Sequence, residues 1–273
     1  MTSPLENTTA PVVFFFYPLY VKETDYTAMN AVIEQLKSHR SIRKYKPDPV
    51  SEEQLLAIVE AGQAASTSSY VQAYSVVAVT DPDKKRRLAH LAADQAYIEE
   101  CPVFLVWCAD LNRLRYAASL EEETRVPDST EIFIIATVDT ALAAQNAVVA
   151  AESLELGIVF IGGIRDNPGD VAQLLELPKY VYPVFGMCLG YPDQAPTIRP
   201  RLPVETVLHR ERYSEDAFAA GIERYNGELR QFGLTREGGK RDTTWSKEMA
   251  NRLRARRRGH MRTFLQEKGF ELE

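Results

Sequence analysis

The apolar positions near the start of the chain recur with the period of amphipathic helices. Residues 27–37 repeat apolar side chains every three or four positions, which predicts a first helix. A second helix begins after Ser51, because Ser51 and Gln54 form the pattern of a capping box. Its apolar stripe runs to Gly62 and gives way to the hydroxyl-rich residues 65–70, which favour turns over helix interiors.

Four short runs are continuously apolar, a pattern that predicts buried strands rather than surface helices. They cover residues 74–80, 103–109, 158–161 and 181–192. Helical patterns lie between them at residues 83–98, 137–156 and 168–176. The Ala-rich helix at 137–156 has no strongly charged face, so we expect it to lie in a domain interior or an oligomer interface, and to end at Gly157.

This order of elements predicts helices packed on a sheet, in an α/β or α+β arrangement. We divide the chain into an arm at 1–25, a core at 26–203 and a helical, polar extension at 204–273 that has no further strand. The arm carries an apolar run at 11–21 that is too short to span a bilayer and lacks a basic start. We therefore expect no membrane span and a cytoplasmic protein.

The composition is that of a soluble globular protein, with 273 residues, 45% of them hydrophobic, and a net charge of −6. The three cysteines form no CxxC pair and the four histidines have no ligand spacing, so we expect neither a disulfide framework nor a metal site. The charge is uneven, however, because residues 236–262 hold ten Lys and Arg against three acids.

A second cationic stretch, SHRSIRKYKP at 38–47, lies where a helix pattern ends. Its donors can converge on an anion, and RPRLP at 199–203 offers two more arginines held by prolines. We interpret the two stretches as two sides of one phosphate site, the alternative being a solvated basic loop. Gly162 and Gly163 directly follow a buried strand and would let a planar ligand approach the backbone. Walker A, GxGxxG and nucleophile-elbow motifs are absent, so the chemistry is expected to belong to a cofactor.

The motifs HRSIRKY, SSYVQ, QNAVVAAESLELGIVFIGGIRDN and VFGMCLGYP, followed by RPRLP, resemble the nitroreductase superfamily over residues 30–273. The similarity is to its NADPH-dependent group of oxygen-insensitive nitroreductases and FMN reductases. It implies an α+β fold with a central, mainly antiparallel sheet flanked by helices, and a C-terminal extension wrapping the body or a partner subunit. It also implies an FMN-bearing homodimer that passes hydride from NADPH through flavin N5, in a ping-pong cycle, to nitroaromatics, quinones or free flavin.

The resemblance also assigns roles to residues. It implies that His39, Ser41, Arg199 and Arg201 surround the FMN phosphate, that Arg43 reaches flavin N1 and O2, and that backbone N–H groups at 160–163 face N5. Phe160 stands where the family often has Tyr, and Arg199 where it often has Lys. No residue is expected to act as an acid or base. The full set of FMN-binding residues comprises His39, Arg40, Ser41, Ile42, Arg43, Thr67, Ser68, Ser69, Gln95, Phe160, Ile161, Gly162, Gly163, Arg199, Pro200 and Arg201.

Basic residues in LTREGGKRDTTW at 234–245 suit a loop that closes on the 2′-phosphate of NADPH. We expect NADPH to be bound by Arg236, Lys240, Arg241 and, further along, Arg258, where related NADPH enzymes also carry basic residues.

Two alternatives remain at this point. One is a specialised superfamily reductase of the dehalogenase or flavin-fragmenting type, although such enzymes usually lack a long C-terminal extension. The other is a nucleic-acid-binding protein acting through residues 251–262. Its arginines fall on several helix faces without interleaved aromatics, and the rest of the chain is acidic, so we expect no nucleic-acid partner.

Overall fold

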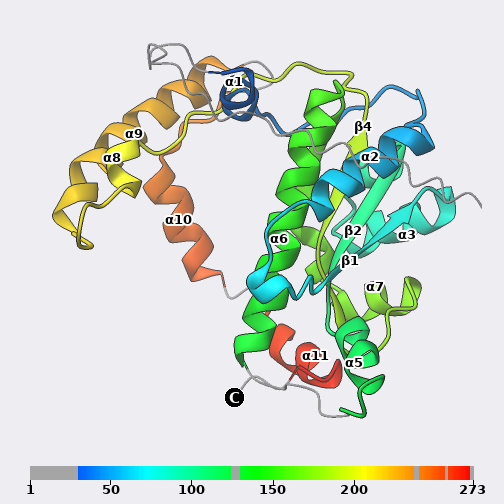
Figure 1. Ribbon diagram of the computed structural model, residues 1–273. Coiled ribbons are helices and arrows are strands. Elements are labelled where there is room, and N and C mark those ends of the chain that lie inside the picture. Colours follow the sequence, from blue (N-terminus) through cyan, green and yellow to red (C-terminus); the bar gives the residue numbers. More distant parts are fainter. Residues whose placement is uncertain (1–29, 124–129, 237–239, 256–257, 271–273) are drawn as a thin grey trace, which may run out of the picture.

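The computed structural model describes residues 30–123, 130–236, 240–255 and 258–270, and the predicted arm at 1–25 lies outside them. Four strands form one sheet in the order β1-β2-β4-β3, and every neighbouring pair is antiparallel. The strands are β1 (Tyr74–Val79), β2 (Val103–Asp110), β3 (Gly157–Ile161) and β4 (Val181–Gly190). The predicted α+β fold with a mainly antiparallel sheet is therefore confirmed (Figure 1).

The four strands differ in burial according to their place in the sheet. All eight residues of β2 are buried, as the apolar run predicted. Strand β1 was also expected to be buried, but it has exposed and half-buried positions, including Ala78. The prediction was wrong there because β1 is an edge strand with a single neighbour, and an apolar run does not distinguish edge from centre. The other edge strand, β3, keeps four of its five residues buried, and the Ile42 N–H bonds to it.

The Ala-rich helix is the long helix α6 (Thr130–Ser153), which packs on β2 and against α2 (Glu52–Gln63). The two helices approach closely at Gly62, where a Cβ would lie 3.1 Å from the Ala143 carbonyl oxygen. By length and composition α6 could cross a membrane, but a third of its residues, among them Asp139, are buried in the body, as in a core helix. The capping box predicted at the start of α2 is present.

Helix α6 begins seven residues earlier than the pattern predicted and ends at Ser153, before Gly157. Glu155, with φ of 60°, makes the turn into β3 instead. The helix also leaves part of its surface uncovered, since Ile134, Val138 and Leu142 are 45–48% exposed. These three residues are spaced by four and form one apolar stripe, here called the α6 stripe.

Other boundaries also shifted. The helix predicted at 83–98 is broken into α3 (Pro82–Leu91) and α4 (Tyr97–Glu100), because Ala93 and Asp94 adopt left-handed φ values of 64° and 55°. The predicted first helix is described only as α1 (Ala31–Lys37). The remaining core elements are η1 (Ser68–Tyr70), α5 (Asn112–Ser119), η2 (Gly162–Arg165) and α7 (Pro168–Leu174).

The extension is helical, and its described residues contain no further strand. It comprises α8 (Val204–Val207), α9 (Asp216–Thr235), α10 (Trp245–Arg254) and α11 (Met261–Glu267). Helices α8 to α10 pack on one another away from the sheet (Figure 1), while α11 returns to the body. Phe264 and Phe270 are buried there, and the ring of Phe270 meets that of Tyr182 edge to face.

Candidate functional site

Two extended segments, far apart in the sequence, lie side by side next to β3. The Ile42 N–H donates to the Ile158 carbonyl at 2.8 Å, which joins the first segment to the sheet. Farther along, the Lys46 N–H donates to Tyr191 at 2.9 Å, and the Asp193 N–H donates to Lys44 at 3.0 Å. These bonds bring the residues after β4 back along the cationic stretch at 38–47, so this stretch and the basic residues at 199–203 converge.

Gly157 is needed at this junction for close packing. Ile42 is buried, and a Cβ on Gly157 would lie 2.5 Å from the Ile42 Cγ1 atom. The prediction that Gly157 ends the preceding helix was therefore wrong. Any side chain at this position would push the first cationic segment away from β3.

The converging segments enclose a cavity of about 310 Å³, here called the clamp pocket. Five arginines and a histidine line it together with Ser41, and no carboxylate is among its described lining residues. Such a group of donors around one hollow suits a doubly charged anion, above all a phosphate monoester. The lining residues are His39, Arg40, Ser41, Arg43, Ala195, Pro196, Thr197, Arg199, Arg201, Phe232 and Arg236.

Two carboxylates that do not line the clamp pocket contact residues that do. His39 Nδ1 lies 2.5 Å from an oxygen of Glu152 near the end of α6, and Glu248 of α10 reaches Arg199 only at 4.0 Å. The Tyr225 hydroxyl of α9 donates to the Pro200 carbonyl at 3.1 Å and so fixes the second basic segment. Sequence reasoning missed these supports, although Glu152 is recognisable as one of few acids in an apolar helix.

The end of β3 lies near the same arginines. The Arg43 guanidinium stacks over the Tyr97 ring at 5.9 Å, and the Tyr97 hydroxyl donates to the side-chain oxygen of Gln95. A Cβ on Gly163 would collide with the Gln95 amide, so the missing side chain makes room for Gln95. Close approach of a ligand was the predicted reason for glycine here and stays a prediction, while packing against Gln95 requires glycine at position 163 in any case.

The other residues expected around the flavin ring, at the end of β3, differ in exposure. Phe160 is 38% exposed and packs edge to face on Phe185, while Ile161 is buried in the core. Behind Arg43, burial raises the pKa of Tyr45 well above its usual range, and Arg43 opposes this shift. The Tyr45 hydroxyl therefore stays protonated and donates to the Ile42 carbonyl at 2.6 Å.

Thr67, Ser68 and Ser69 do not line the clamp pocket. They are attached to α6 at Asp139, whose carboxylate accepts the Ser68 N–H at 3.0 Å. Asp139 and Glu152 are 13 residues apart on this helix, which separates the two groups by about 20 Å. Within one chain, the predicted FMN residues therefore form two separate sets.

The residues predicted for NADPH also divide. Arg236 lines the clamp pocket, and Arg241 pairs with Glu248 at 3.4 Å, close to Arg199. Lys240 is exposed, and the glycines predicted beside it lie outside the described residues. Arg258 lies elsewhere, 2.8 Å from Asp166 just after η2.

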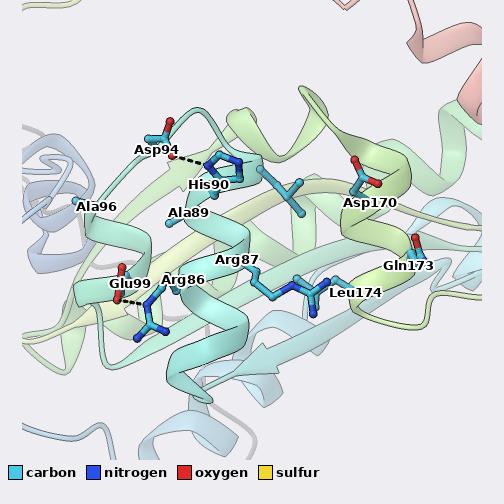
Figure 2. Close-up of a pocket in the computed structure, with 11 residues that line it drawn as sticks. Arg86, Arg87, Ala89, His90, Asp94, Ala96, Glu99, Asp170, Gln173 and Leu174 are labelled. Atoms are coloured by element: carbon cyan, nitrogen blue, oxygen red, sulfur yellow. Dashed lines mark hydrogen bonds and ion pairs between the residues drawn. The ribbon is translucent and has the colours of Figure 1, made fainter.

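A larger groove of about 670 Å³ lies on the outer side of α3, α4 and α7 (Figure 2). Arg86 of this groove pairs with Asp83 and Glu99, and His90 pairs with Asp94, while Arg87 adds a further cation. Asp170 adds a further acid to its wall. This groove is larger than the clamp pocket but offers no excess charge of one sign, so its electrostatics select no anion.

Comparison with known proteins agrees with this geometry. Residues 36–191 match the model of the nitroreductase family, and residues 199–273 match that of the nitroreductase family C-terminal domain. An FMN reductase (NADPH) of Bacillus subtilis is 40% identical, with 89% of this chain and 99% of that protein covered. An NADPH-flavin oxidoreductase of Vibrio harveyi is 41% identical, with 88% of this chain and 98% of that protein covered.

Solved structures show the same relationship. The structure of B. megaterium NfrA1 has a TM-score of 0.85 and 44% identity, covering 89% of this chain and 100% of its own. The NADPH:FMN oxidoreductase from Vibrio harveyi, complexed with NAD+, has a TM-score of 0.77 and 39% identity, covering 89% of this chain and 99% of its own. Sequence motifs, fold and clamp pocket thus agree, and the chain belongs to the nitroreductase family.

Proposed function

We propose that this protein is an FMN-dependent NADPH oxidoreductase that reduces nitroaromatics, quinones or free flavin. The observation that carries the proposal is the clamp pocket, in which five arginines and His39 converge without a lining carboxylate. Relatives that are about 40% identical over nearly their whole length are named as NADPH-dependent FMN or flavin reductases, which supports it.

The pocket fits the phosphate end of FMN. A phosphate monoester carries close to two negative charges and accepts charge-assisted hydrogen bonds, which the guanidinium groups of Arg199 and Arg201 donate well. His39 and Ser41 supply further donors, and Arg40 also lines the pocket. Pro200 lies between Arg199 and Arg201 and fixes their segment through the bond that its carbonyl accepts from Tyr225. The Glu152 contact orients His39 toward this task.

The flavin ring is placed between Arg43 and the end of β3 in this proposal. Arg43, held by the Tyr97 ring, offers a fixed positive charge, and Gln95 packs beside Gly163 next to it. When bound, FMN supplies two-electron transfer between a nicotinamide and an acceptor. The chain's own residues bind and orient the cofactor, with Phe160, Ile161 and Gly162 along the ring, and none is assigned as an acid or base.

We propose a homodimer in which Thr67, Ser68 and Ser69 of one subunit complete the site of the other. Two observations support it: the separation of about 20 Å between these residues and the clamp pocket of the same chain, and the uncovered α6 stripe. The stripe lies on the same helix as both anchors, Asp139 and Glu152. Light scattering of an active, flavin-loaded monomer would contradict this.

The remaining expectations also stand as proposals. NADPH is recognised through Arg236, Lys240, Arg241 and Arg258, the protein is cytoplasmic, and residues 204–273 act as an extension of the core at 26–203. The position of Arg236 in the clamp pocket and of Arg241 near Arg199 supports a nicotinamide site beside the flavin site.

A visible absorption spectrum of the purified protein tests the function. We expect a flavin spectrum, release of FMN rather than FAD on denaturation, and NADPH-dependent reduction of a quinone, a nitroaromatic compound and added FMN. A protein that contains no flavin and takes up none when FMN is added would refute the proposal.

A further inference from the structure

A buried carboxylate outside the clamp pocket has no role in the proposed chemistry. Asp139 of α6 is 0% exposed, and within the described residues it forms no ion pair. Its two oxygens accept backbone N–H groups, from Ser68 at 3.0 Å and from Ala73 at 3.2 Å. Burying a carboxylate is costly unless it is hydrogen-bonded. The two bonds to the Ser68 and Ala73 N–H groups offset this cost, so the structure uses the buried carboxylate to hold these two residues.

The two bonds bracket a strained turn. Between Ser68 and Ala73, three residues other than glycine adopt left-handed backbone angles: Ser69 with φ of 46°, Tyr70 with 59° and Gln72 with 54°. Such angles are unfavourable for residues with a Cβ and persist only where the surroundings hold them. Tyr70 is 83% exposed, so burial of its side chain does not hold the turn. Asp139 of α6 bonds to both ends of the turn, and at the far end the buried Ala73 also accepts the Asp110 N–H at 3.0 Å.

We infer that Asp139 is a positioning residue that fixes the turn at 68–73 so that Thr67, Ser68 and Ser69 can complete the flavin site of the partner subunit. The inference rests on the proposed function and deepens it. Helix α6 then serves both sites, because Glu152 orients His39 in the clamp pocket and Asp139 holds the turn about 20 Å away. The sequence signal is the same for both: one of three acids in an otherwise apolar helix.

Asp139→Asn tests this with little change in volume. The amide keeps one oxygen acceptor but turns an NH₂ group toward a backbone N–H, which breaks one of the two bonds. The matched control is Thr140→Val, the next residue on α6. Thr140 is also 0% exposed, and its hydroxyl bonds to the carbonyls of Ala136 at 2.7 Å and Cys108 at 3.4 Å, neither of which belongs to the turn.

Both variants are compared with wild type by the melting temperature of the apoprotein and by titration of the apoprotein with FMN, followed by flavin fluorescence. We expect both to melt at lower temperature. Only Asp139→Asn should raise the Kd for FMN, by about ten- to hundredfold, while Thr140→Val keeps the wild-type Kd. If Asp139→Asn does not fold, Asp139→Ser, which keeps one oxygen acceptor, enters the same comparison.

A rescue variant adds a measurement that a purely structural role would not move. Gln72 is exposed and its side chain donates to the Tyr70 carbonyl at 3.4 Å within the turn, so Gln72→Gly relieves the left-handed strain without removing a hydrogen bond to α6. Added to Asp139→Asn, it should restore part of the FMN affinity. Equal Kd values for wild type, Asp139→Asn and Thr140→Val would overturn the inference. Failure of the wild-type apoprotein to bind FMN would instead refute the proposed function.

Discussion

The clamp pocket and the basic C-terminal segment, residues 236–262, share Arg236, but they differ in how their other cations are paired. In the pocket, five arginines converge and no carboxylate is among the described lining residues. In the described part of the C-terminal segment, Arg241 pairs with Glu248 at 3.4 Å and Arg258 with Asp166 at 2.8 Å, while Asp242 pairs with Arg230 at 2.5 Å. Arginines that converge on a hollow with no carboxylate among its described lining residues can bind an anionic ligand there. The ion pairs of Arg230, Arg241 and Arg258 instead tie the extension to itself and to the core.

Of the variants that test this comparison, Arg201→Ala should show the largest loss, measured as affinity for FMN. We expect FMN binding to weaken by about 1.5–3 kcal/mol, or roughly ten- to hundredfold in Kd, because a charge-assisted hydrogen bond to phosphate is lost. Titration of the apoprotein with FMN measures it. The melting temperature of the apoprotein should not change, since Arg201 is exposed and forms no ion pair within the described residues.

Arg258→Ala is the control for that variant, because Arg258 is paired with Asp166 outside the clamp pocket. It should keep the wild-type affinity for FMN and lose a little thermal stability. Equal losses of FMN affinity in the two variants would remove the distinction between available and paired arginines.

Lys240→Ala and Arg236→Ala sharpen the comparison within the C-terminal segment. Each should raise the KM for NADPH about ten- to hundredfold, the effect of losing one charge-assisted contact to the 2′-phosphate. The KM for NADH should hardly change. Measuring kcat/KM with both nicotinamides checks this, together with the FMN content. Because only Arg236 lines the clamp pocket, Lys240→Ala is the cleaner variant. Equal losses with both nicotinamides would mean that the loop is structural.

Asp242→Asn should have the smallest effect. Its partner Arg230 lowers the pKa of Asp242 through a direct hydrogen bond, but both side chains are more than half exposed, where ion pairs contribute little. The depressed pKa places any stabilisation above the ordinary value of 3.8, and that stabilisation is lost as the pH falls below it. Melting curves of wild type and variant should differ at most slightly at pH 7, and the difference should shrink as the pH falls below 3.8.

Local sequence signals predicted most of the elements but not their limits. The capping box at Ser51 and the continuous apolar run of β2 each act within a few residues, and the structure contains both features. The break after α3 escaped prediction because one Asp in a helical pattern is a weak turn signal, and nothing in the sequence marks Ala93 for its left-handed angle. The turn places the Gln95 side chain against Gly163, which lies in another part of the chain, so a tertiary contact explains why the helix breaks here.

The sequence by itself determined that basic residues gather at 38–47 and at 199–203, and it predicted that one anion site should involve both. Only the tertiary structure decided how they meet, because the backbone bonds from Ile42 to Ile158 and from Lys46 to Tyr191 join segments that no local signal relates. It also decided which arginines are available, since Arg258 finds Asp166 across 92 residues. Residue types set the possible chemistry, and their pairing in space sets which charges remain for a ligand.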